Sequence, residues 1–365
     1  MKAVILAGGF GTRLRPLSCT RPKLLFPIGN RPILDWTIEK LSKSGINEII
    51  LAVNYMADII IHTYGRSKFG AKLLYSKEER PLGTAGPIRK ASSMIGKEDS
   101  FIVLNGDIFT DIDYRELIEA HRKNGGVATI SLVEVQDPSR YGVVILDENK
   151  VTDFIEKPHS SEATSNLVNA GIYVFTPEIF NYIGVGGDQT LSFEKEVFPR
   201  LAKEGNLYGK VFKGLWMDIG EPRDYLYTNQ LVLKSAFANN WFGRSAKIGA
   251  NVKVEAPSVI GSRVKVGEDS VIGPVVSVGD SVYIGRGVHI QNSIIFEGAT
   301  ISDFSSVKSA IIGENATIGK WVKIEEGCIV GDHTFINDNV TLTRDVTVCP
   351  SKEVSESVLT SKSLL

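Results

Sequence analysis

A glycine-rich segment near the start of the chain combines residue types that suit phosphate binding. Residues 6–17 read LAGGFGTRLRPL and follow a short apolar stretch. Glycines allow backbone N–H groups to converge on phosphate oxygens, because no Cβ stands in the way. With Gly9 and Gly11 as the first two glycines, Leu14 occupies the third glycine position of the dinucleotide fingerprint, and no Gly-Lys-Ser/Thr follows as in a Walker A loop. We therefore expect a phosphate loop of another kind, although a plain glycine turn remains the alternative.

Basic residues are concentrated around this loop. The first 34 residues contain no acidic side chain and six basic ones: Lys2, Arg13, Arg15, Arg21, Lys23 and Arg31. We expect them to attract a polyphosphate, with Arg13 making bidentate contacts and Lys23 acting as a compact charge. The whole chain has a net charge of only −1. That balance argues against a nucleic acid or an anionic membrane as the partner and favours a small molecule.

Two carboxylates are candidates for metal binding. Asp107 follows the apolar stretch 101–104, and Asp218 lies between Trp216 and Gly220. Two carboxylates from distant segments suit Mg²⁺, whose remaining ligands are phosphates and waters. Each residue taken alone has a structural explanation: an Asn-Gly-Asp turn for Asp107, and a helix N-cap ahead of Pro222 for Asp218.

The elements that must position these residues alternate between strands and helices up to about residue 237. Apolar runs predict strands at 3–7, 49–53, 101–104, 128–135 and 172–175, and helical patterns occupy 32–45, 85–96 and 114–125. This alternation predicts an α/β sheet, which binds ligands at the carboxyl ends of its strands. Residues 141–175 contain strands but no convincing helix, so we expect an antiparallel addition that forms a pocket wall.

A six-residue repeat replaces this pattern in the second part of the chain. Aliphatic residues recur at 248, 254, 260, 266, 272, 278, 284 and 290, with Phe296 continuing the series, and then at 312, 318, 324, 330, 336, 342 and 348. Such a repeat predicts a β-helix in which stacked coils bury a column of aliphatic side chains. The interval of 16 residues between Phe296 and Ile312 requires a register slip, which we expect near residues 303–309.

These patterns define the expected domains and compartment. They are a catalytic domain at 1–237, a linker at 238–247, a β-helix at 248–350 and a loosely packed tail at 351–365. The three cysteines (Cys19, Cys328 and Cys349) are far apart and fit neither a disulfide framework nor a zinc site. No signal peptide or membrane span is recognisable, so we expect a cytoplasmic protein.

Several motifs together resemble those of sugar-phosphate nucleotidylyltransferases. They are GGFGTRLRPL and RPKLLFPIGNRPIL, PLGTAG at 81–86, Asn-Gly-Asp at 105–107, Tyr-Gly at 141–142, Glu-Lys-Pro at 156–158, Asn-Ala-Gly at 169–171 and WMDIG at 216–220. The resemblance spans nearly the whole chain. With the hexapeptide repeats, it is most similar to the mannose-1-phosphate guanylyltransferases of that family.

The resemblance implies a Rossmann-like mixed-sheet nucleotidyltransferase domain followed by a left-handed parallel β-helix. It implies transfer of a nucleotidyl group from GTP to mannose 1-phosphate, with Arg13 and Lys23 on the phosphates and Mg²⁺ held by Asp107 and Asp218. Such a reaction depends on positioning and charge neutralisation and needs no covalent nucleophile. The nucleotide would contact Leu6, Ala7, Gly8, Gly9, Gly11, Thr12, Glu78, Gly83 and Thr84. The sugar phosphate would contact Gly142, Glu156, Lys157 and Asn169.

Base choice depends on Glu78 or its neighbour Glu79. Guanine presents two adjacent donors, N1–H and the N2 amino group, and a carboxylate can accept both. In related uridylyl- and thymidylyltransferases the resemblance places Gln at the position of Glu78, so the carboxylate favours GTP. The alternative is a solvated Lys-Glu-Glu-Arg loop.

Other functions stay open at this stage. The same chemistry with UTP or dTTP and glucose 1-phosphate would change only the base or the sugar, and a noncatalytic regulatory subunit would share the two-domain plan. Regulatory chains have no chemical reason to keep Arg13, Lys23, Asp107 and Asp218. An acyltransferase activity using His289 or His333 is disfavoured because no long loop interrupts the repeats, and His121 is expected in the core. We expect the repeat surface to support a homo-oligomer.

Overall fold

The computed structural model describes residues 1–159, 164–237 and 239–364. Contacts divide the chain into two compact units. The first contains Met1–Gly9 and Leu34–Asp218, and the second contains Phe10–Ile33 and Ile219–Leu365. The units therefore cut across the expected catalytic domain at 1–237, because residues 10–33 and 219–237 belong with the β-helix.

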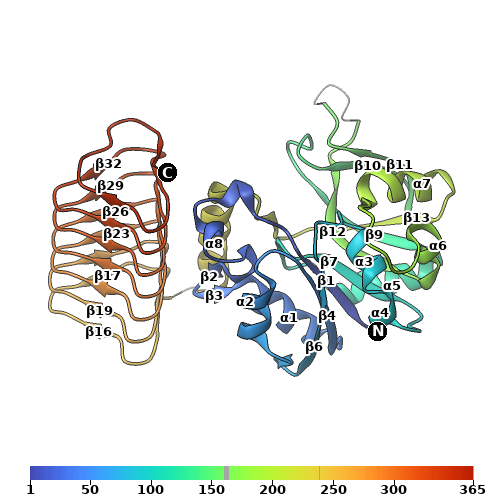
Figure 1. Cartoon of the computed structure of the whole chain (residues 1–365), viewed down its shortest axis with the longest axis horizontal. Coiled ribbons are helices and arrows are strands. Elements are labelled where there is room, and N and C mark those ends of the chain that lie inside the picture. The colour runs from blue at the N-terminus through green and yellow to red at the C-terminus, as the bar shows by residue number, and fades with distance from the viewer. Residues whose placement is uncertain (160–163, 238, 365) are drawn as a thin grey trace. The chain divides into compact units, whose positions relative to one another are not determined.

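The first unit is built on a ten-stranded mixed sheet (Figure 1). Its order is β10-β11-β13-β9-β12-β7-β1-β4-β6-β5. The strands are β1 Ala3–Ala7, β4 Glu48–Val53, β5 Ser67–Lys68, β6 Ala71–Lys77, β7 Phe101–Asn105, β9 Ala128–Glu134, β10 Gly142–Asp147, β11 Lys150–Glu156, β12 Leu167–Phe175 and β13 Leu207–Val211. β7, β1, β4 and β6 are parallel neighbours, so their carboxyl ends meet at one edge. β10, β11 and β12 pair antiparallel, as expected for residues 141–175.

Short helices connect these strands. They are α1 Ile33–Lys43, α2 Ala57–Tyr64, α3 Gly86–Lys90, α4 Ser92–Ile95, α5 Tyr114–Asn124, α6 Phe180–Ile183 and α7 Phe198–Lys203, with a π-helical turn at Phe193–Val197 and a 3₁₀ turn at Pro177–Ile179. The predicted helix at 85–96 is thus two helices. His121 on α5 is 3% exposed, its ring meets Thr129 Oγ1 at 3.0 Å, and burial lowers its pKa to about 4. It is a core residue, as expected.

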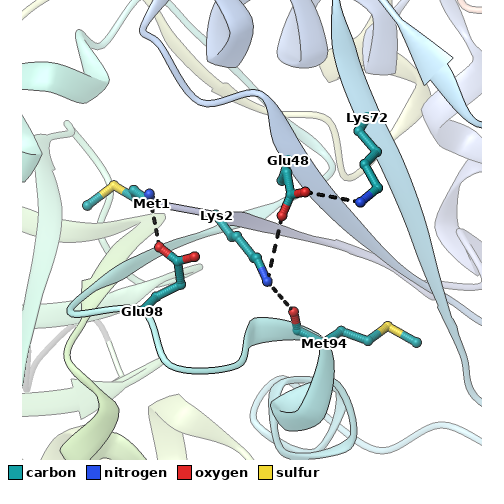
Figure 2. Close-up of polar contacts among 6 residues, drawn as sticks. All are labelled: Met1, Lys2, Glu48, Lys72, Met94 and Glu98. Carbon is teal, nitrogen blue, oxygen red and sulfur yellow. Dashed lines mark hydrogen bonds and ion pairs between the residues drawn. The ribbon is translucent and has the colours of Figure 1, made fainter.

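Lys2, one of the basic residues expected to attract a polyphosphate, lies at the amino ends of the parallel strands. Lys2 precedes β1, whereas the glycine loop follows it, so the two lie at opposite ends of the strand. Figure 2 shows the Lys2 ammonium donating to the carbonyl of Met94 (2.8 Å) and pairing with Glu48 (3.6 Å), which also binds Lys72. Lys2 therefore fastens the amino ends of the strands and does not contribute to a phosphate site.

The second unit contains the parallel β-helix that the repeat predicts, of the left-handed hexapeptide type that the resemblance implies (Figure 1). Its first sheet contains β15 Trp241–Phe242, β18 Ser258–Ile260, β21 Val276–Val278, β24 Ile294–Ile295, β27 Ile311–Ile312, β30 Ile329–Val330, β33 Thr347–Val348 and β35 Ser363–Leu364. The second contains β16 Lys247–Ile248, β19 Lys265–Val266, β22 Tyr283–Ile284, β25 Thr300–Ile301, β28 Thr317–Ile318, β31 Phe335–Ile336 and β34 Glu353–Val354. The third contains β17 Lys253–Val254, β20 Val271–Ile272, β23 His289–Gln291, β26 Ser306–Lys308, β29 Lys323–Ile324 and β32 Thr341–Leu342.

The register of the repeat slips twice rather than once. Val278 pairs with Ile295 and not with Phe296, so the next inward side chain comes five positions after Ile290 instead of six. A second short step leads from Val307 to Ile312, where Ser309 adopts a positive φ of 48°. The assignment of Phe296 to the inward column was therefore wrong. The Phe296 ring instead packs near Phe26 and Tyr225, with centroids 6.3 and 6.5 Å away.

The expected tail forms a further coil. β34 pairs with β31, Val358 bridges to Leu342, and β35 pairs with β33. Val354 and Val358 are 6% and 5% exposed. Residues 351–364 therefore continue the β-helix, which ends later than predicted.

The outer side of the first β-helix sheet is covered within the second unit. α8 (Pro222–Ala236) supplies Leu233, which packs with Val259 and Val275, and Asn229, which accepts from the Ser277 hydroxyl. The remaining segment, residues 10–33, contains the hairpin β2 Pro27–Ile28 and β3 Arg31–Pro32 and the 3₁₀ turns Thr12–Leu14, Leu17–Cys19 and Lys23–Leu25. No helix in the described part of the chain is both long and apolar enough to cross a bilayer.

Candidate functional site

Three neighbouring strand ends bring the glycine loop and Glu78 together in the first unit. Gly8 follows β1, Asn54 follows β4 and Glu78 follows β6, and the strands are in register at Ala7, Val53 and Lys77. A Cβ on Gly8 would lie 3.3 Å from Glu78 Oε1 and 3.1 Å from Asn54 Cβ. A larger residue at position 8 would therefore press against the carboxylate that is expected to bind the base.

Glu78 and Glu79 have different environments. Glu78 is 5% exposed, and burial raises the pKa of its carboxyl group to about 7, although the Leu82 N–H and Lys90 act in the opposite direction. Glu79 is exposed. A solvated loop would expose both side chains, so of the two residues expected to bind the base, the burial of Glu78 favours Glu78 over Glu79.

The loop that contains Gly83 and Thr84 is fixed by a second segment. Gly83 has a φ of 78° and forms a parallel bridge with Leu191, whose carbonyl oxygen would lie 2.3 Å from an added Cβ. The Thr84 hydroxyl donates to Glu194 (2.6 Å) and accepts from the Phe193 N–H (2.9 Å). The hydroxyl of Thr84 is therefore occupied in holding the loop, so a nucleotide contact here would use the backbone.

Asp107 and Asp218 come from adjacent strands. Asp107 lies in the turn between β7 and β8 (Ile108–Thr110), and Asp218 ends β14 (Trp216–Asp218). β14 pairs antiparallel with β8 so that Asp218 is opposite Ile108, the residue after Asp107. The N-cap of α8 is Glu221, so the N-cap explanation for Asp218 does not hold. The pairing fits a cation held by two carboxylates, and no group of three or more His, Cys, Asp or Glu ligands occurs among the described residues.

The residues expected to bind the sugar phosphate lie on β10 and β12 and at the end of β11, with Lys157 directly after that strand. Gly142 is opposite Glu156, and a Cβ on Gly142 would lie 3.0 Å from Glu156 Oε2. Burial raises the pKa of Glu156, as does nearby Glu194, whereas Lys157 lowers it. The Lys157 ammonium lies 3.4 Å from Glu156 and its side chain is 64% exposed. The structure thus presents a mostly buried carboxylate beside an accessible cation.

Asn169 is held in place by its own strand. Its amide donates to the Tyr173 hydroxyl (3.0 Å), and its side-chain oxygen accepts from the Gly171 N–H (3.0 Å). The indole of Trp216 donates to the Ala170 carbonyl (2.9 Å) and packs edge-on against Tyr141, with ring centroids 5.2 Å apart. These contacts connect the strand of Asp218 to the residues expected to bind the sugar phosphate.

The remaining phosphate-loop residues belong to the second unit. Gly11 adopts a left-handed conformation (φ 60°), and an added Cβ would lie 3.7 Å from Lys23 Cβ. Thr12 and Arg13 begin the 3₁₀ turn that follows, and both are exposed. The Arg13 guanidinium lies 3.7 Å from the Glu221 carboxylate and is 62% exposed. In the first unit, Leu6 and Ala7 belong to β1, and Gly9 follows it as an exposed residue.

Sequence reasoning missed several residues of these clusters. Asn54 has a buried side-chain nitrogen without a hydrogen-bond partner in the described structure, and Tyr173, Trp216 and Glu194 anchor the predicted residues. Tyr173 and Trp216 stand within or beside motifs already quoted, so their aromatic side chains were a usable signal. Asn54 and Glu194 gave no signal in the sequence, because only the pairing of strands and loops brings them close to the predicted residues.

Two sequence families match the chain. The family described as nucleotidyl transferase matches residues 2–235, and the family described as GMPPB C-terminal domain matches residues 254–364. Mannose-1-phosphate guanyltransferase of Kluyveromyces lactis is 43% identical over 366 residues, and that of Aspergillus oryzae is 40% identical over 369 residues. Each alignment covers 98% of this chain and 98% of the relative.

Solved structures resemble the chain over a shorter length. HddC from Yersinia pseudotuberculosis has 34% sequence identity and a TM-score of 0.54, covering 63% of this chain and 98% of its own. A second structure of that protein, complexed with GMP-PN, has 33% identity and a TM-score of 0.53.

Proposed function

Because the chain belongs to the nucleotidyl transferase family, we propose that it transfers GMP from GTP to mannose 1-phosphate, giving GDP-mannose and pyrophosphate. The observation that carries the base assignment is the buried Glu78 carboxylate beside Gly8. The full-length similarity to enzymes named mannose-1-phosphate guanyltransferase supports the sugar.

The reaction joins a sugar phosphate oxygen to the α-phosphorus of GTP while the bond to the bridging oxygen of pyrophosphate breaks. No proton has to be removed from an ionised phosphate, so the protein contributes mainly positioning and charge. Arg13 and Lys23 hold the triphosphate and the leaving pyrophosphate, and their positive charge offsets the charge that develops there. Lys157 holds the incoming sugar phosphate.

Mg²⁺ fits the pair of carboxylates from β14 and the β7–β8 turn. Asp107 and Asp218 would supply hard oxygen ligands, and the bound ion would neutralise charge on the phosphates. A set of two protein carboxylates leaves room for phosphate and water ligands, which is usual for Mg²⁺ at nucleotide sites.

Recognition of the base and the sugar follows from hydrogen-bonding capacity. The ionised Glu78 carboxylate accepts from N1–H and the N2 amino group of guanine, two donors that uracil and thymine do not present side by side. Glu156, Asn169 and the backbone at Gly142 bind sugar hydroxyls. A buried polar group left without its hydroxyl partner is costly, so these residues discriminate between sugars.

Pyrophosphate release by the purified full chain tests the proposal. GTP, UTP, dTTP and ATP are each assayed with Mg²⁺ against mannose 1-phosphate and glucose 1-phosphate, and GTP with mannose 1-phosphate is expected to lead. UTP or dTTP with glucose 1-phosphate in the lead would retain the chemistry and refute the base assignment. No turnover in any combination by a folded protein would favour a regulatory subunit.

We also place this activity in the cytoplasm, in a homo-oligomer. All three cysteines are free, which suits a reducing compartment.

A further inference from the structure

One corner of the β-helix, where the first sheet ends, carries an acidic side chain in each of four successive coils. These residues follow β21, β24, β27 and β30, and they are Asp280, Glu297, Glu314 and Asp332. We call this set the acidic corner. Arg263, from the preceding coil, lies 3.5 Å from Asp280 and 3.9 Å from Glu297. The other two carboxylates, Glu314 and Asp332, instead contact residues 20 and 21, which belong to the same unit.

Asp332 uses its two carboxylate oxygens for different contacts. Oδ1 accepts from the Glu314 N–H at 2.7 Å, which joins the turns of two adjoining coils, and Oδ2 accepts from the Thr20 hydroxyl at 2.6 Å. Asp332 is 3% exposed, and burial raises the pKa of its carboxyl group, whereas the Thr20 hydrogen bond and the charge of Arg21 lower it. Thr20 and Arg21 therefore stabilise the ionised form of a carboxylate that the β-helix has buried.

Asp280 provides a comparison at the same corner. Its Oδ1 accepts from the Ser262 N–H at 2.8 Å, in the same way as that of Asp332, but its Oδ2 faces the Arg263 guanidinium. Bonding between adjoining turns is thus a repeated property of the β-helix. The contact with Thr20 is an addition, which Asp332 makes to a segment outside the coils.

Arg21 is held by the β-helix from two directions. Its guanidinium pairs with the Glu314 carboxylate and lies over the Phe296 ring, 4.9 Å from the ring centroid. The Arg21 side chain is 18% exposed. An ion pair and an aromatic face together compensate the charge of an arginine locally. Arg21, which the sequence placed among the residues expected to attract a polyphosphate, is therefore engaged by the β-helix instead.

Phe296 reaches this position because of the first register slip. Its N–H donates to a carbonyl of the next coil (2.9 Å), in the same way as those of Gly279 and Gly313 in the coils on either side. Phe296 therefore occupies a corner position that is glycine in the adjoining coils, and its ring points out of the β-helix. The residue is 1% exposed and contacts Arg21 and, edge-on, Phe26, with the two phenyl centroids 6.3 Å apart.

Lys23 lies between the two residues that this ring contacts. It comes two positions after Arg21 and three before Phe26, within a 3₁₀ turn. In the turn, the Leu25 N–H donates to the Pro22 carbonyl (2.9 Å) and the Phe26 N–H to the Lys23 carbonyl (3.0 Å). Contacts on both sides therefore fix the backbone from which the Lys23 side chain extends.

We propose that Phe296, Glu314 and Asp332 of the β-helix are positioning residues for Lys23. They act through the residues on either side of Lys23, so that its ammonium group is placed before a triphosphate arrives. A lysine on an unanchored loop would have to be ordered on binding, which weakens affinity. This role rests on the proposed function, in which Lys23 holds the triphosphate.

A charge swap separates positioning from direct contact with phosphate. Arg21→Glu places a carboxylate opposite Glu314, and Glu314→Arg places a second guanidinium opposite Arg21. Each single variant of the full chain is expected to raise KM for GTP about tenfold while KM for mannose 1-phosphate stays unchanged, because only the triphosphate depends on Lys23. The double variant restores an ion pair and should recover most of this loss.

An arginine that bound phosphate directly could not be replaced by glutamate. A double variant as impaired as Arg21→Glu would therefore overturn the proposal. A wild-type KM for GTP in Glu314→Arg would overturn it as well.

Asp332→Ala and its matched control, Asp280→Ala, separate positioning from a general loss of stability. Both remove the bond between adjoining turns of the same corner, but only Asp332→Ala also removes the contact with Thr20. KM for GTP should rise in Asp332→Ala and stay at the wild-type value in Asp280→Ala. An equal rise in both variants would assign the effect to a weakened β-helix and would contradict the role of Asp332.

Hydrogen exchange tests the anchoring of the turn without relying on catalysis. Peptides that span Leu25 and Phe26 are expected to exchange about tenfold faster in Glu314→Arg and Asp332→Ala than in the wild type or Asp280→Ala. Wild-type exchange in both variants would refute the anchoring. Absence of turnover by the wild-type protein would instead refute the proposed function, and faster exchange in these variants would still support a turn held by the β-helix.

Discussion

Glu78, the residue proposed to bind guanine, has an unusual protonation equilibrium. Burial raises the pKa of its carboxyl group to about 7, so near neutrality a large fraction is protonated and cannot accept from both guanine donors. The proposed contact between Glu78 and the base would therefore depend on pH.

Loss of ionised Glu78 should lower the use of GTP in acid. We expect kcat/KM for GTP to fall as the pH drops through 7 and to approach a tenfold loss per pH unit well below it, because only the ionised form binds the base. Glu78→Gln should flatten this part of the profile and reduce GTP use relative to UTP, whereas Glu79→Gln should change neither. Profiles from pH 5.5 to 8.5 test this, and an unchanged GTP/UTP ratio in Glu78→Gln would refute the guanine assignment.

Asp107 and Asp218 should be needed for turnover rather than for folding. We expect Asp107→Asn and Asp218→Asn each to lower kcat at least 100-fold, because an amide removes the negative charge that a divalent cation requires. Thermal midpoints should stay within a few degrees of wild type, since both residues lie in partly exposed positions. Asp111→Asn, which makes the same change directly after β8, is the control and should turn over normally. Near-normal turnover by Asp107→Asn or Asp218→Asn would exclude a metal site made by this pair of carboxylates.

The sequence predicted these residues unevenly. Asp107, Glu156 and Asn169 stand in motifs whose residue types already indicate their chemistry. Asn54 and Glu194 could not be predicted, because they reach the site only through the pairing of β4 with β1 and of Leu191 with Gly83. Lys2 was wrongly included among the phosphate-binding residues, because it is close to the glycine loop in sequence but lies at the opposite end of β1.

The loop around Gly83 depends on a close approach between two backbone segments. Gly83→Ala should destabilise the protein by about 3 kcal/mol or more, because the new Cβ would meet the Leu191 carbonyl and the φ of 78° is strained for alanine. Gly45→Ala is a matched control, with a φ of 84° and nothing within 4 Å, and should cost only about 1–2 kcal/mol.

Urea unfolding of the two variants gives the comparison. Equal costs would mean that the strained φ alone matters and that the approach to Leu191 relaxes without loss.

Strands were easier to predict than helices in this chain. Buried parallel strands such as β1 and β4 are continuous apolar runs, so their limits are visible in the sequence. The helical pattern at 85–96 concealed a break at Ala91, because the periodicity of side chains continues across it. The slips at Ile295 and Ile312 were hidden by a similar ambiguity, since Ile294, Ile295 and Phe296 are consecutive apolar residues.

The division of the chain into two units could not be read from composition. Residues 10–33 carry the phosphate motif yet pack with the β-helix unit, where Thr20 donates to Asp332 (2.6 Å) and Arg21 pairs with Glu314. The first β-helix sheet accordingly has apolar outward residues that are nearly inaccessible: Val259, Ile294, Ile311 and Ile329 are 1%, 1%, 2% and 6% exposed.

The isolated β-helix should therefore expose these apolar side chains and should not remain a monodisperse fragment. We expect a fragment of residues 246–365 to associate nonspecifically and to bind a hydrophobic dye, because it lacks α8, whose Leu233 packs with Val259, and residues 10–33, which belong to the same compact unit. Ile294→Thr with Ile311→Lys should restore a monodisperse fragment. Substitutions of outward residues on the third sheet, such as Val271→Thr, should not. A monodisperse, dye-negative parent fragment would contradict this view of the covered sheet.

The stacked coils also mean that the β-helix can change in length only by a fixed unit, which is one complete coil. Three hexads close one coil, so inserting a single hexad would carry every later residue from one side of the prism to the next. The outward-facing residues of the second sheet, from Lys265 in β19 to Glu353 in β34, would then be divided between two sheets, although the aliphatic interior would remain intact. Only whole coils can be gained or lost without scrambling the outer columns, so evolution can lengthen this domain in steps of about eighteen residues while its surface stays aligned.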